Sequence, residues 1–549
     1  METRIDCIVV GYNDARFADL LQRTEWSRSF SGGYRHLLVN SVPFRNERLS
    51  YVELLNRAIE LATGKPSRLH VGKLPNLGVY YLVSFLRRRS FRAELVNFFN
   101  DEKEEFKALL RQRPRSVAIT TTFYYEAAPI QEIVAFTRQH SPETKVIVGG
   151  PHIFNICSDH PPLMRDTLLR EIGADIYVFD SQGEATLARV CAELREPNPD
   201  LSRVPNLIYA VDEKTYQQTV RQVEANDMDA EAVDWSLFDP HFIGPTVQTR
   251  TARSCAFKCA FCRYPVVGGP LNLTSLSVVE HELHYLKSIG VSRLLFIDDT
   301  FNIPLRRFKD LCRMMIRNNF GIQWFSYFRC SNADMESFDL MAEAGCKGVF
   351  LGIESGDDEV LKAMNKAASS EKYAKAIGEL NRRQIITYAS FIIGHPGETD
   401  ESARRSLEFI EATSPSFYCL ETFFYDPKVP IGARADEFGL SGAGYSWKHR
   451  SMNWQHASDI VEEGYRTIRN SVICPLYGFD LWSIAYLLGQ QISLEQIREF
   501  LTASGMLINQ TGNAGAVRKL ENAVVDVFRD KQRELPPLVT ATEASVLRN

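Results

Sequence analysis

The sequence lacks the features by which several broad classes of protein are recognised. It has no run of roughly 18 apolar residues without charges, which a membrane-spanning helix would need. Its 63 lysines and arginines are balanced by 68 aspartates and glutamates, and the net charge of −5 disfavours a nucleic-acid-binding surface. The first residues carry acids and run directly into an apolar strand pattern, unlike a secretory signal. We therefore expect a cytoplasmic protein that binds neither membranes nor nucleic acids.

Cysteine is also scarce. Eleven cysteines among 549 residues are too few for a disulfide scaffold, and in a reducing compartment clustered cysteines more often bind metals. Most of them are scattered along the chain, but Cys255, Cys259 and Cys262 stand close together. At roughly 100–200 residues per domain, the length predicts three or four domains.

The N-terminal part, residues 1–200, alternates short apolar β-branched runs with helical patterns. This alternation predicts a doubly wound, Rossmann-like α/β domain with a parallel sheet, whose ligands bind at the carboxyl ends of the strands. No G-x-G-x-x-G follows the first predicted strand, which argues against a nicotinamide dinucleotide. The predicted strand ends are instead rich in Gly, Thr and Ser, at Gly11–Asp14, Thr120–Thr122, Gly149–His152 and Ser181–Glu184.

A second alternation covers residues 246–430, where six strand–helix repeats predict a partial (β/α)6 barrel with its chemistry at the strand C-termini. Residues 201–245 are rich in acids and weakly periodic, and we interpret them as a connector. Residues 431–549 predict a mainly helical C-terminal domain that covers the barrel mouth and the substrate. Its many aromatic side chains belong to a hydrophobic core more often than to a substrate pocket.

Cys255, Cys259 and Cys262 form a Cys-x3-Cys-x2-Cys sequence directly after the first predicted barrel strand. Three thiolates on one tight loop suit a [4Fe–4S] cluster whose fourth iron stays open, whereas structural zinc normally has four protein ligands. Phe257 and Phe261 would shield such a cluster from water. Three buried cysteines without a metal, or a zinc site with a ligand distant in sequence, are the alternatives.

This sequence, placed after the first strand of a six-repeat barrel, resembles the radical S-adenosylmethionine (SAM) superfamily. The resemblance implies that the open iron binds the amino and carboxylate groups of SAM. It also implies that an electron, provided by an external flavodoxin- or ferredoxin-type donor, cleaves SAM to a 5′-deoxyadenosyl radical. The SAM-binding residues that it implies are Phe261, Asp298, Asp299, Ser326, Arg329, Glu354 and His395.

Several of these residues also have an ordinary structural interpretation. The carboxylates Asp298 and Asp299 would face the SAM ammonium, or serve as helix caps or loop residues. Arg329 offers a two-pronged guanidinium to the SAM carboxylate, or forms an ordinary ion pair. Glu354 would accept the ribose hydroxyl protons. His395 would lie near adenine, or is only a turn residue.

A doubly wound domain in front of such a barrel resembles the cobalamin-dependent class of radical SAM enzymes. The cobalamin-binding residues that this implies are Tyr12, Asn13, Thr120, Thr121, Thr122, Phe123, Gly149, Gly150, Pro151, His152, Gln182, Gly183 and Glu184. The Asp-x-His-x-x-Gly sequence that supplies a histidine to cobalt in other cobalamin proteins is absent, which implies a base-off cobalt. Any one of these residues is also common at the strand ends of α/β domains.

Within that class, the chain resembles the branch of the P-methyltransferases of phosphinothricin tripeptide biosynthesis. Matching stretches include Asp6–Gly11, Arg250–Ser254, Asp298–Asn302 and Gly348–Gly352. The resemblance implies methyl transfer from methylcobalamin to an unactivated carbon or a phosphinate phosphorus of a small-molecule or peptide substrate, in secondary metabolism. The size and polarity of the chain are compatible with a monomer. The alternatives are a cobalamin-binding radical SAM enzyme that catalyses rearrangement, ring contraction or cyclisation without methyl transfer, and a non-catalytic sensor.

Overall fold

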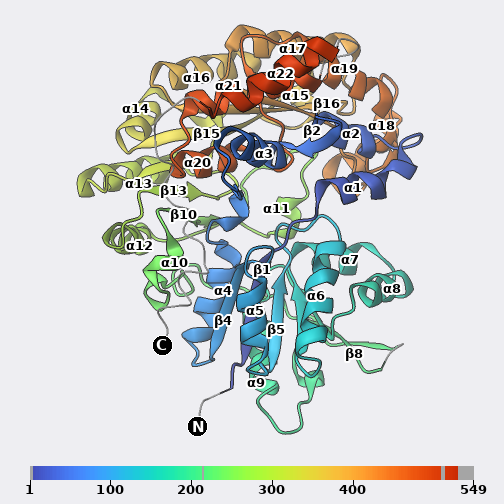
Figure 1. The fold of residues 1–549 in the computed structure, drawn as a ribbon, viewed down its shortest axis with the longest axis vertical. Coiled ribbons are helices and arrows are strands. Elements are labelled where there is room, and N and C mark those ends of the chain that lie inside the picture. The colour runs from blue at the N-terminus through green and yellow to red at the C-terminus, as the bar shows by residue number, and fades with distance from the viewer. Residues whose placement is uncertain (1–3, 213–214, 509–513, 530–549) are drawn as a thin grey trace. The chain divides into compact units, whose positions relative to one another are not determined.

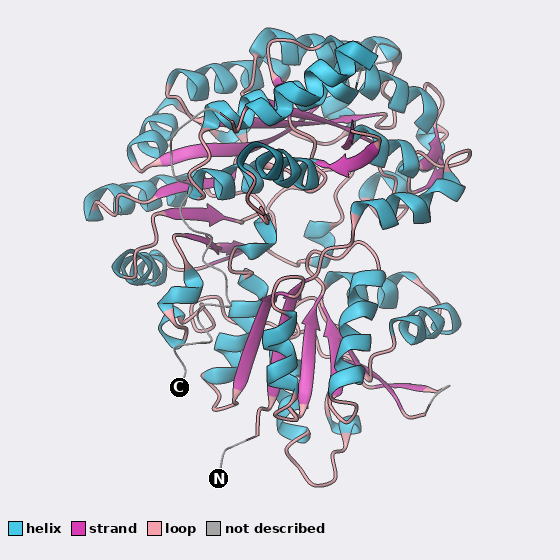
Figure 2. Ribbon diagram, in the orientation of Figure 1, coloured by secondary structure: helices cyan, strands magenta, loops and turns pink. Residues whose placement is uncertain are grey.

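The chain folds into two compact units in the computed structural model, which describes residues 4–212, 215–508 and 514–529. The first unit contains residues 4–15 and 72–244, and the second contains residues 16–71 together with the described chain from residue 245 onward. Helices and strands alternate through both units, as Figure 2 shows. None of the helices in the described ranges is long and apolar enough to cross a membrane.

The first unit is built on a seven-stranded sheet in the order β4-β1-β5-β6-β7-β8-β9. The first five strands in this order pair in parallel. β8 then pairs antiparallel with β7, and β9 pairs antiparallel with β8. Their bounds are β4 (Ala93–Phe98), β1 (Cys7–Tyr12), β5 (Ser116–Thr120), β6 (Lys145–Gly149), β7 (Ile176–Val178), β8 (Leu207–Ala210) and β9 (Tyr216–Gln218).

Helices cover both faces of this sheet, which confirms the doubly wound prediction (Figure 1). Side chains from α5 (Lys103–Leu110), α6 (Ala128–His140), α7 (Pro151–Asp159) and α8 (Pro162–Ile172) join one face in a single hydrophobic core. The other face packs against α4 (Leu77–Arg87) and α9 (Glu184–Glu193). The strands are apolar along both faces because both are buried in this way.

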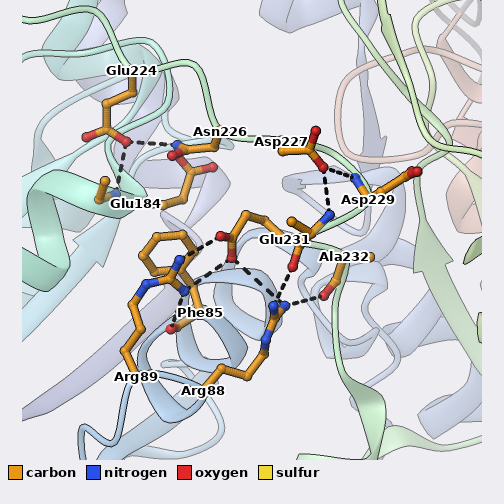
Figure 3. A network of polar contacts seen from close by, with 12 residues as sticks. Phe85, Arg88, Arg89, Glu184, Glu224, Asn226, Asp227, Asp229, Glu231 and Ala232 are labelled. Atoms are coloured by element: carbon orange, nitrogen blue, oxygen red, sulfur yellow. Dashed lines mark hydrogen bonds and ion pairs between the residues drawn. The ribbon is translucent and has the colours of Figure 1, made fainter.

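Residues 201–244 belong to the first unit, although their weak periodicity predicted a connector. They add β8 and β9 to the edge of the sheet. Hydrogen bonds and ion pairs then hold the chain after β9 (Figure 3). The Glu224 carboxylate accepts hydrogen bonds from the backbone N–H groups of Ala185 and Thr186 at the N-terminus of α9, at 2.9 and 2.7 Å. Glu231 pairs with Arg89 at 2.6 Å. Such long-range contacts leave no periodic signal in the sequence.

The second unit contains a parallel seven-stranded sheet in the order β10-β13-β14-β15-β16-β17-β20, one strand more than predicted. The strands are β10 (Thr246–Thr249), β13 (Arg293–Phe296), β14 (Gln323–Tyr327), β15 (Cys346–Glu354), β16 (Ile386–Ile393), β17 (Phe417–Thr422) and β20 (Val472–Ile473). The helices between them are α12 (Leu276–Ser288), α13 (Leu305–Asn318), α14 (Met335–Glu343), α15 (Asp358–Ala363), α16 (Ser370–Arg382) and α17 (Asp400–Thr413). This arrangement confirms the partial barrel.

Residues 16–71 fold with the second unit, whereas the sequence placed them in the N-terminal domain. The hairpin of β2 (Ser41–Phe44) and β3 (Glu47–Ser50) packs on α21 (Leu494–Ile508), and α3 (Tyr51–Thr63) packs on α22 (Ala514–Asp526). From α2 (Gly33–Val39), Arg35 donates to Glu462 at 2.6 Å on α19 (Trp454–Thr467). These partners lie more than 400 residues farther along the chain than residues 16–71, so local sequence patterns could not identify them.

The Glu224 contact yields a first prediction. Glu224→Ala removes the acceptor of two backbone donors and of the Thr186 hydroxyl, so we expect the unfolding free energy of the first unit to fall by about 1–3 kcal/mol. Chemical denaturation measures the loss. Glu105→Ala, an exposed position on α5, is the matched control and should change the midpoint little. Equal midpoints for both variants would contradict this role of Glu224.

Candidate functional site

The three clustered cysteines lie on the loop that follows the first barrel strand. Cys259 is buried, and Cys255 and Cys262 are partly exposed. The backbone N–H of Cys262 donates to the carbonyl of Cys259 at 3.1 Å, which folds the end of the loop into a turn. Ser254, just before the loop, has a φ of +71°, in the left-handed region that non-glycine residues seldom adopt. The chain therefore bends sharply into the cysteine loop.

Two other segments of the barrel unit hold this loop. The N–H of Ala260 donates to the carbonyl of Met364 at 2.8 Å, and the side-chain amide of Asn365 donates to the carbonyl of Lys258 at 2.7 Å. On its other side, the N–H of Ile431 donates to the carbonyl of Ala260 at 2.8 Å. The loop is thus fixed at its centre by backbone contacts that do not depend on the thiols.

The cysteine loop presents three thiols as possible metal ligands. No three His, Cys, Asp or Glu side chains within the described ranges are gathered to hold one metal ion. In a [4Fe–4S] cluster with three cysteine ligands, each cysteine binds a different iron, so the ligands stand farther apart than those of a mononuclear site. Burial, and then the charges of Cys259 and Cys255, raise the pKa of the Cys262 thiol. A bound cationic cluster core would relieve that accumulation of negative charge.

Arg329 lies directly beside the cysteine loop. Its guanidinium stacks on the ring of Phe257 at 3.5 Å and donates from Nη1 to Sγ of Cys259 at 3.8 Å. Nη2 donates to the carbonyl of Lys366, and the side chain is buried. The structure therefore places Arg329 against the cysteine loop, rather than in an ordinary surface ion pair.

The neighbouring carboxylates Asp298 and Asp299 have different environments. Asp298 is buried, and it accepts from the N–H and hydroxyl of Thr251, each at 2.6 Å, and from the N–H of Ala252 at 3.1 Å. These bonds fix the turn between β10 and the cysteine loop, so both oxygens of Asp298 already have protein partners. Asp299 is exposed. Of the two, the structure leaves Asp299 as the one able to face SAM.

Ser326 does not reach the carboxyl-end site, contrary to prediction. Alternation along β14 puts it on the same face as Trp324, whose ring packs on Phe308 of α13. Its hydroxyl is fully buried and has no partner among the described residues. The next residue, Tyr327, takes the opposite face and packs on Phe350 at 5.1 Å. The sequence indicated Ser326 rather than Tyr327 because Ser326 is polar, and residue type does not reveal which side chains of β14 face the helices.

Glu354 ends β15 in a strained conformation. Its φ is +66°, and its carboxylate accepts from the buried ammonium of Lys366 at 2.8 Å. A Cβ on Gly352 would lie 2.5 Å from the Glu354 carboxylate, so only glycine leaves room for that side chain. Lys366 also lies 5.4 Å from the ring centre of Phe261. Lys366, in a loop without a recognisable pattern, was not predicted.

His395 lies in the loop after β16 and is fully buried. Its Nδ1–H donates to the Pro396 carbonyl at 3.0 Å, which leaves Nε2 as an acceptor without a partner in the described part of the chain. Burial lowers the pKa of His395 to about 3, so the ring is neutral. The His395 and Phe261 rings lie 6.4 Å apart. The loop therefore brings an uncharged acceptor next to the cysteine loop's aromatic residue.

In the first unit, the ends of β1, β5 and β6 lie side by side because the strands pair in register. The hydroxyls of Thr120 and Thr122 lie 3.2 Å apart, and Phe123 is exposed. If Gly78 carried a Cβ, that atom would lie 3.7 Å from each of the two hydroxyls, an ordinary van der Waals distance. Tyr12 ends β1, Gly149 ends β6, and Pro151 and His152 begin α7, all at the same edge. These groups form a polar and aromatic rim at the strand ends.

Several residues predicted for this rim instead hold the protein together. Thr121 donates to the Gly149 carbonyl and accepts from the N–H of His152. Asn13 is buried, and its Nδ2 donates to the carbonyl of Pro129 and to the carboxylate of Glu132. Gly150, with a φ of +105°, lets the chain turn into α7 without a side chain. These polar groups already have protein partners, with the exception of the buried Asn13 Oδ1, which lacks one among the described residues.

The third part of the predicted rim is covered by the segment after β9. Gln182 donates to the Glu224 carbonyl and accepts from the N–H of Asn226. Glu184 accepts from the side chain of Asn226 at 2.8 Å (Figure 3). Gly183, between them, has a φ of +86° and caps α9. Residues 224–226 thus occupy the polar groups that the sequence assigned to a ligand.

The contrast between the two adjacent carboxylates gives a second prediction. Asp298→Asn replaces one acceptor oxygen by a donor facing Thr251, so the unfolding free energy of the second unit should fall by about 1–3 kcal/mol. Asp299→Asn is the matched control and should stay within about 0.5 kcal/mol of the wild type. Chemical denaturation of both variants compares them. A larger loss for Asp299→Asn would contradict these assignments.

Comparison with known proteins supports the organisation derived above. Residues 249–410 match the model of the radical SAM superfamily, which includes the cysteine loop and the strand ends through β16. An uncharacterized methyltransferase of Pyrococcus horikoshii is 24% identical over 346 residues, which cover 61% of this chain and 72% of the relative. The anaerobic magnesium-protoporphyrin IX monomethyl ester cyclase of Rubrivivax gelatinosus is 22% identical over 362 residues, which cover 63% of each protein.

Among solved structures, the fold is similar to that of TsrM from Kitasatospora setae, a radical SAM methyltransferase solved with cobalamin and a [4Fe–4S] cluster bound. The TM-score is 0.58 at 18% identity, and the match covers 83% of this chain and 96% of TsrM. The predicted fold class is therefore confirmed across most of the chain. Residues 249–410 are thus similar to the radical SAM superfamily, within a fold similar to that of a radical SAM methyltransferase solved with cobalamin bound.

Proposed function

We propose that the protein is a cobalamin-dependent radical SAM methyltransferase. The observation that carries this proposal is the loop of Cys255, Cys259 and Cys262 at the carboxyl end of the first barrel strand, within the part that matches the radical SAM model. A [4Fe–4S] cluster with SAM supplies a 5′-deoxyadenosyl radical, and methylcobalamin supplies a methyl group. The doubly wound first unit, whose strand-end rim suits a large amide-bearing ligand, supports cobalamin as the second cofactor.

The residues of the barrel unit would divide the work as follows. Cys255, Cys259 and Cys262 would ligate the cluster, and Arg329 would stabilise the thiolate charge beside Cys259. Exposed Asp299 would face the SAM ammonium. Glu354, held by Lys366, would accept the ribose hydroxyls, and neutral His395 would lie near adenine.

In the first unit, Thr120, Thr122 and Phe123, with the backbone after β6, would contact cobalamin, because their polar and aromatic groups are exposed or only partly buried. We propose a small-molecule or peptide substrate in secondary metabolism, methylated at an unactivated carbon or a phosphinate phosphorus. A flavodoxin- or ferredoxin-type donor would provide electrons to a monomer. A reducing cytoplasm would suit the eleven cysteines, all of which are free thiols.

A second candidate is a radical SAM enzyme that cyclises or rearranges its substrate without methyl transfer. The similarity to an anaerobic cyclase over 362 residues favours it. Both candidates need SAM cleavage, but only the methyltransferase consumes a second SAM to restore methylcobalamin. Product analysis therefore separates them. A non-catalytic sensor would not require the open cluster site.

The cysteine loop yields a third prediction. Changing Cys255, Cys259 and Cys262 together to Ala removes all three thiolates, so we expect iron binding and SAM cleavage to disappear while cobalamin binding persists. Iron and cobalt analysis with an assay for 5′-deoxyadenosine measures these properties. The matched control replaces the buried cysteines Cys312 and Cys346, which lie away from the loop, and should retain iron. Persistent SAM cleavage in the triple variant would refute the cluster assignment.

The mode of turnover yields a fourth prediction. With substrate, SAM and a reductant under anaerobic conditions, we expect one S-adenosylhomocysteine and one 5′-deoxyadenosine for each methylated product, because two SAM molecules serve different roles. Chromatography with mass detection quantifies all three compounds. Product formed with 5′-deoxyadenosine alone would favour the cyclase or rearrangement alternative.

A further inference from the structure

The barrel face opposite the outer helices has an aromatic layer near the middle of its strands. Tyr327, Phe350 and Tyr388 occupy neighbouring positions on β14, β15 and β16. Their rings lie 5.1 and 4.9 Å apart, and Trp482 of α20 (Leu481–Gly489) packs on Tyr327 at 5.0 Å. We call these four residues the aromatic floor.

The next positions toward the carboxyl ends carry small side chains. Two residues farther along the same face, Gly352, Ser390 and Cys419 lie beside one another on β15, β16 and β17. One further step brings Glu421, paired in register with Ile392. Gly352, Ile392 and Glu421 all keep partial solvent exposure, as does Phe350 of the aromatic floor. Glu421 thus stands two residues beyond Cys419 on the face that carries the aromatic layer, while the space beside Gly352 is taken by the Glu354 carboxylate and the Lys366 ammonium.

Glu421 has one polar partner, and a weak one. Its Oε2 lies 3.4 Å from Nδ1 of His36 on α2, and each side chain is 15% exposed. Oε1 is buried and has no hydrogen-bond partner among the described residues. Tyr445 stacks on the His36 ring at 5.0 Å. This pair plays no part in the cluster or SAM contacts assigned above.

Within the described residues, Glu421 has no lysine or arginine as an ion-pair partner, and Lys366, the cation beside Gly352, is paired with Glu354 at 2.8 Å. Burial raises the pKa of Glu421 to about 8 and lowers that of His36 to about 4, so both are uncharged near neutral pH. The other titratable groups that sense Glu421 are the thiol of Cys419 and the hydroxyl of Tyr465, neither of which is cationic. A ligand cation would offset the cost of ionising the buried carboxyl, and aromatic faces also attract cations.

We propose that Glu421, positioned by His36, binds a protonated amine of the substrate above the aromatic floor. This inference rests on the proposed function, and it assigns the substrate to the class of arylalkyl or alkyl amines. The ammonium group donates to the unpartnered Oε1, and the carbon skeleton packs toward Phe350 and its aromatic neighbours. On binding, Glu421 gives up its proton to solvent and becomes the counterion.

The test uses the full chain with iron and cobalt restored, and 2-phenylethylamine, 2-phenylethanol and 3-phenylpropionate as probes. Isothermal titration calorimetry in two buffers of different ionisation enthalpy measures both affinity and proton release. The wild type should bind the amine at least tenfold more tightly than the alcohol. A carboxyl with a pKa of about 8 is about nine-tenths protonated at a pH of about 7, so binding should release about 0.9 proton.

Glu421→Gln keeps the size of the side chain but cannot ionise, so the amine's tenfold advantage and the proton release should both vanish. Glu408→Gln, at an exposed position on α17, is the matched control and should retain both. If Glu421→Gln does not fold, the pH dependence of proton release by the wild type tests the proposal without the variant. Its proton release must fall toward zero above a pH of about 9, where the free carboxyl is already ionised.

Equal affinity of the wild type for amine and alcohol, a preference for 3-phenylpropionate, or an unchanged amine preference in Glu421→Gln would each overturn the inference. Formation of 5′-deoxyadenosine from SAM by the wild type tests the proposed function separately. A wild type that cleaves SAM without preferring the amine refutes only the role of Glu421. A wild type that does not cleave SAM refutes the proposed function, whatever the amine result.

Discussion

Parallel pairing of the barrel strands is the constraint on which the candidate chemistry depends. Because β10 and β13 to β17 run in the same direction, their carboxyl ends meet at one edge. The cysteine loop, Glu354 and Glu421 come from segments far apart in sequence, and this shared direction gathers them within one unit. Backbone contacts from Met364 and Ile431 then hold the loop itself.

Charge is distributed unevenly around this edge. Arg329 stands beside Cys259, and buried Lys366 pairs with Glu354 at 2.8 Å. In the part of the chain that the structure describes, the polar partner of Glu421 is the neutral ring of His36. The unfavourable energy of a buried, unpaired charge explains why Glu421 holds its proton in the free protein. The same physics makes it the group most sensitive to the charge of a ligand.

The sequence was sufficient to predict both parallel sheets and the cysteine loop, since periodicity and motif spacing are local signals. It was insufficient where long-range contacts decide the outcome. Residues 16–71 pair with helices more than 400 residues away, and residues 224–226 bond to Gln182 and Glu184, which were predicted as ligand contacts. Ser326 and Tyr327 were misjudged because residue type does not reveal which face of a strand points toward the helices. Lys366 gave no signal at all.

The central claim is that one chain carries both a cluster and cobalamin. The most direct measurement is the anaerobic ultraviolet–visible spectrum of protein produced with cobalamin uptake, together with iron, sulfide and cobalt analysis. The account predicts about four irons per chain, as a [4Fe–4S] cluster requires, and about one cobalt with a base-off cobalamin spectrum. Four irons without cobalt, even after reconstitution, would contradict methyl transfer from cobalamin and leave the first unit as a module for another ligand.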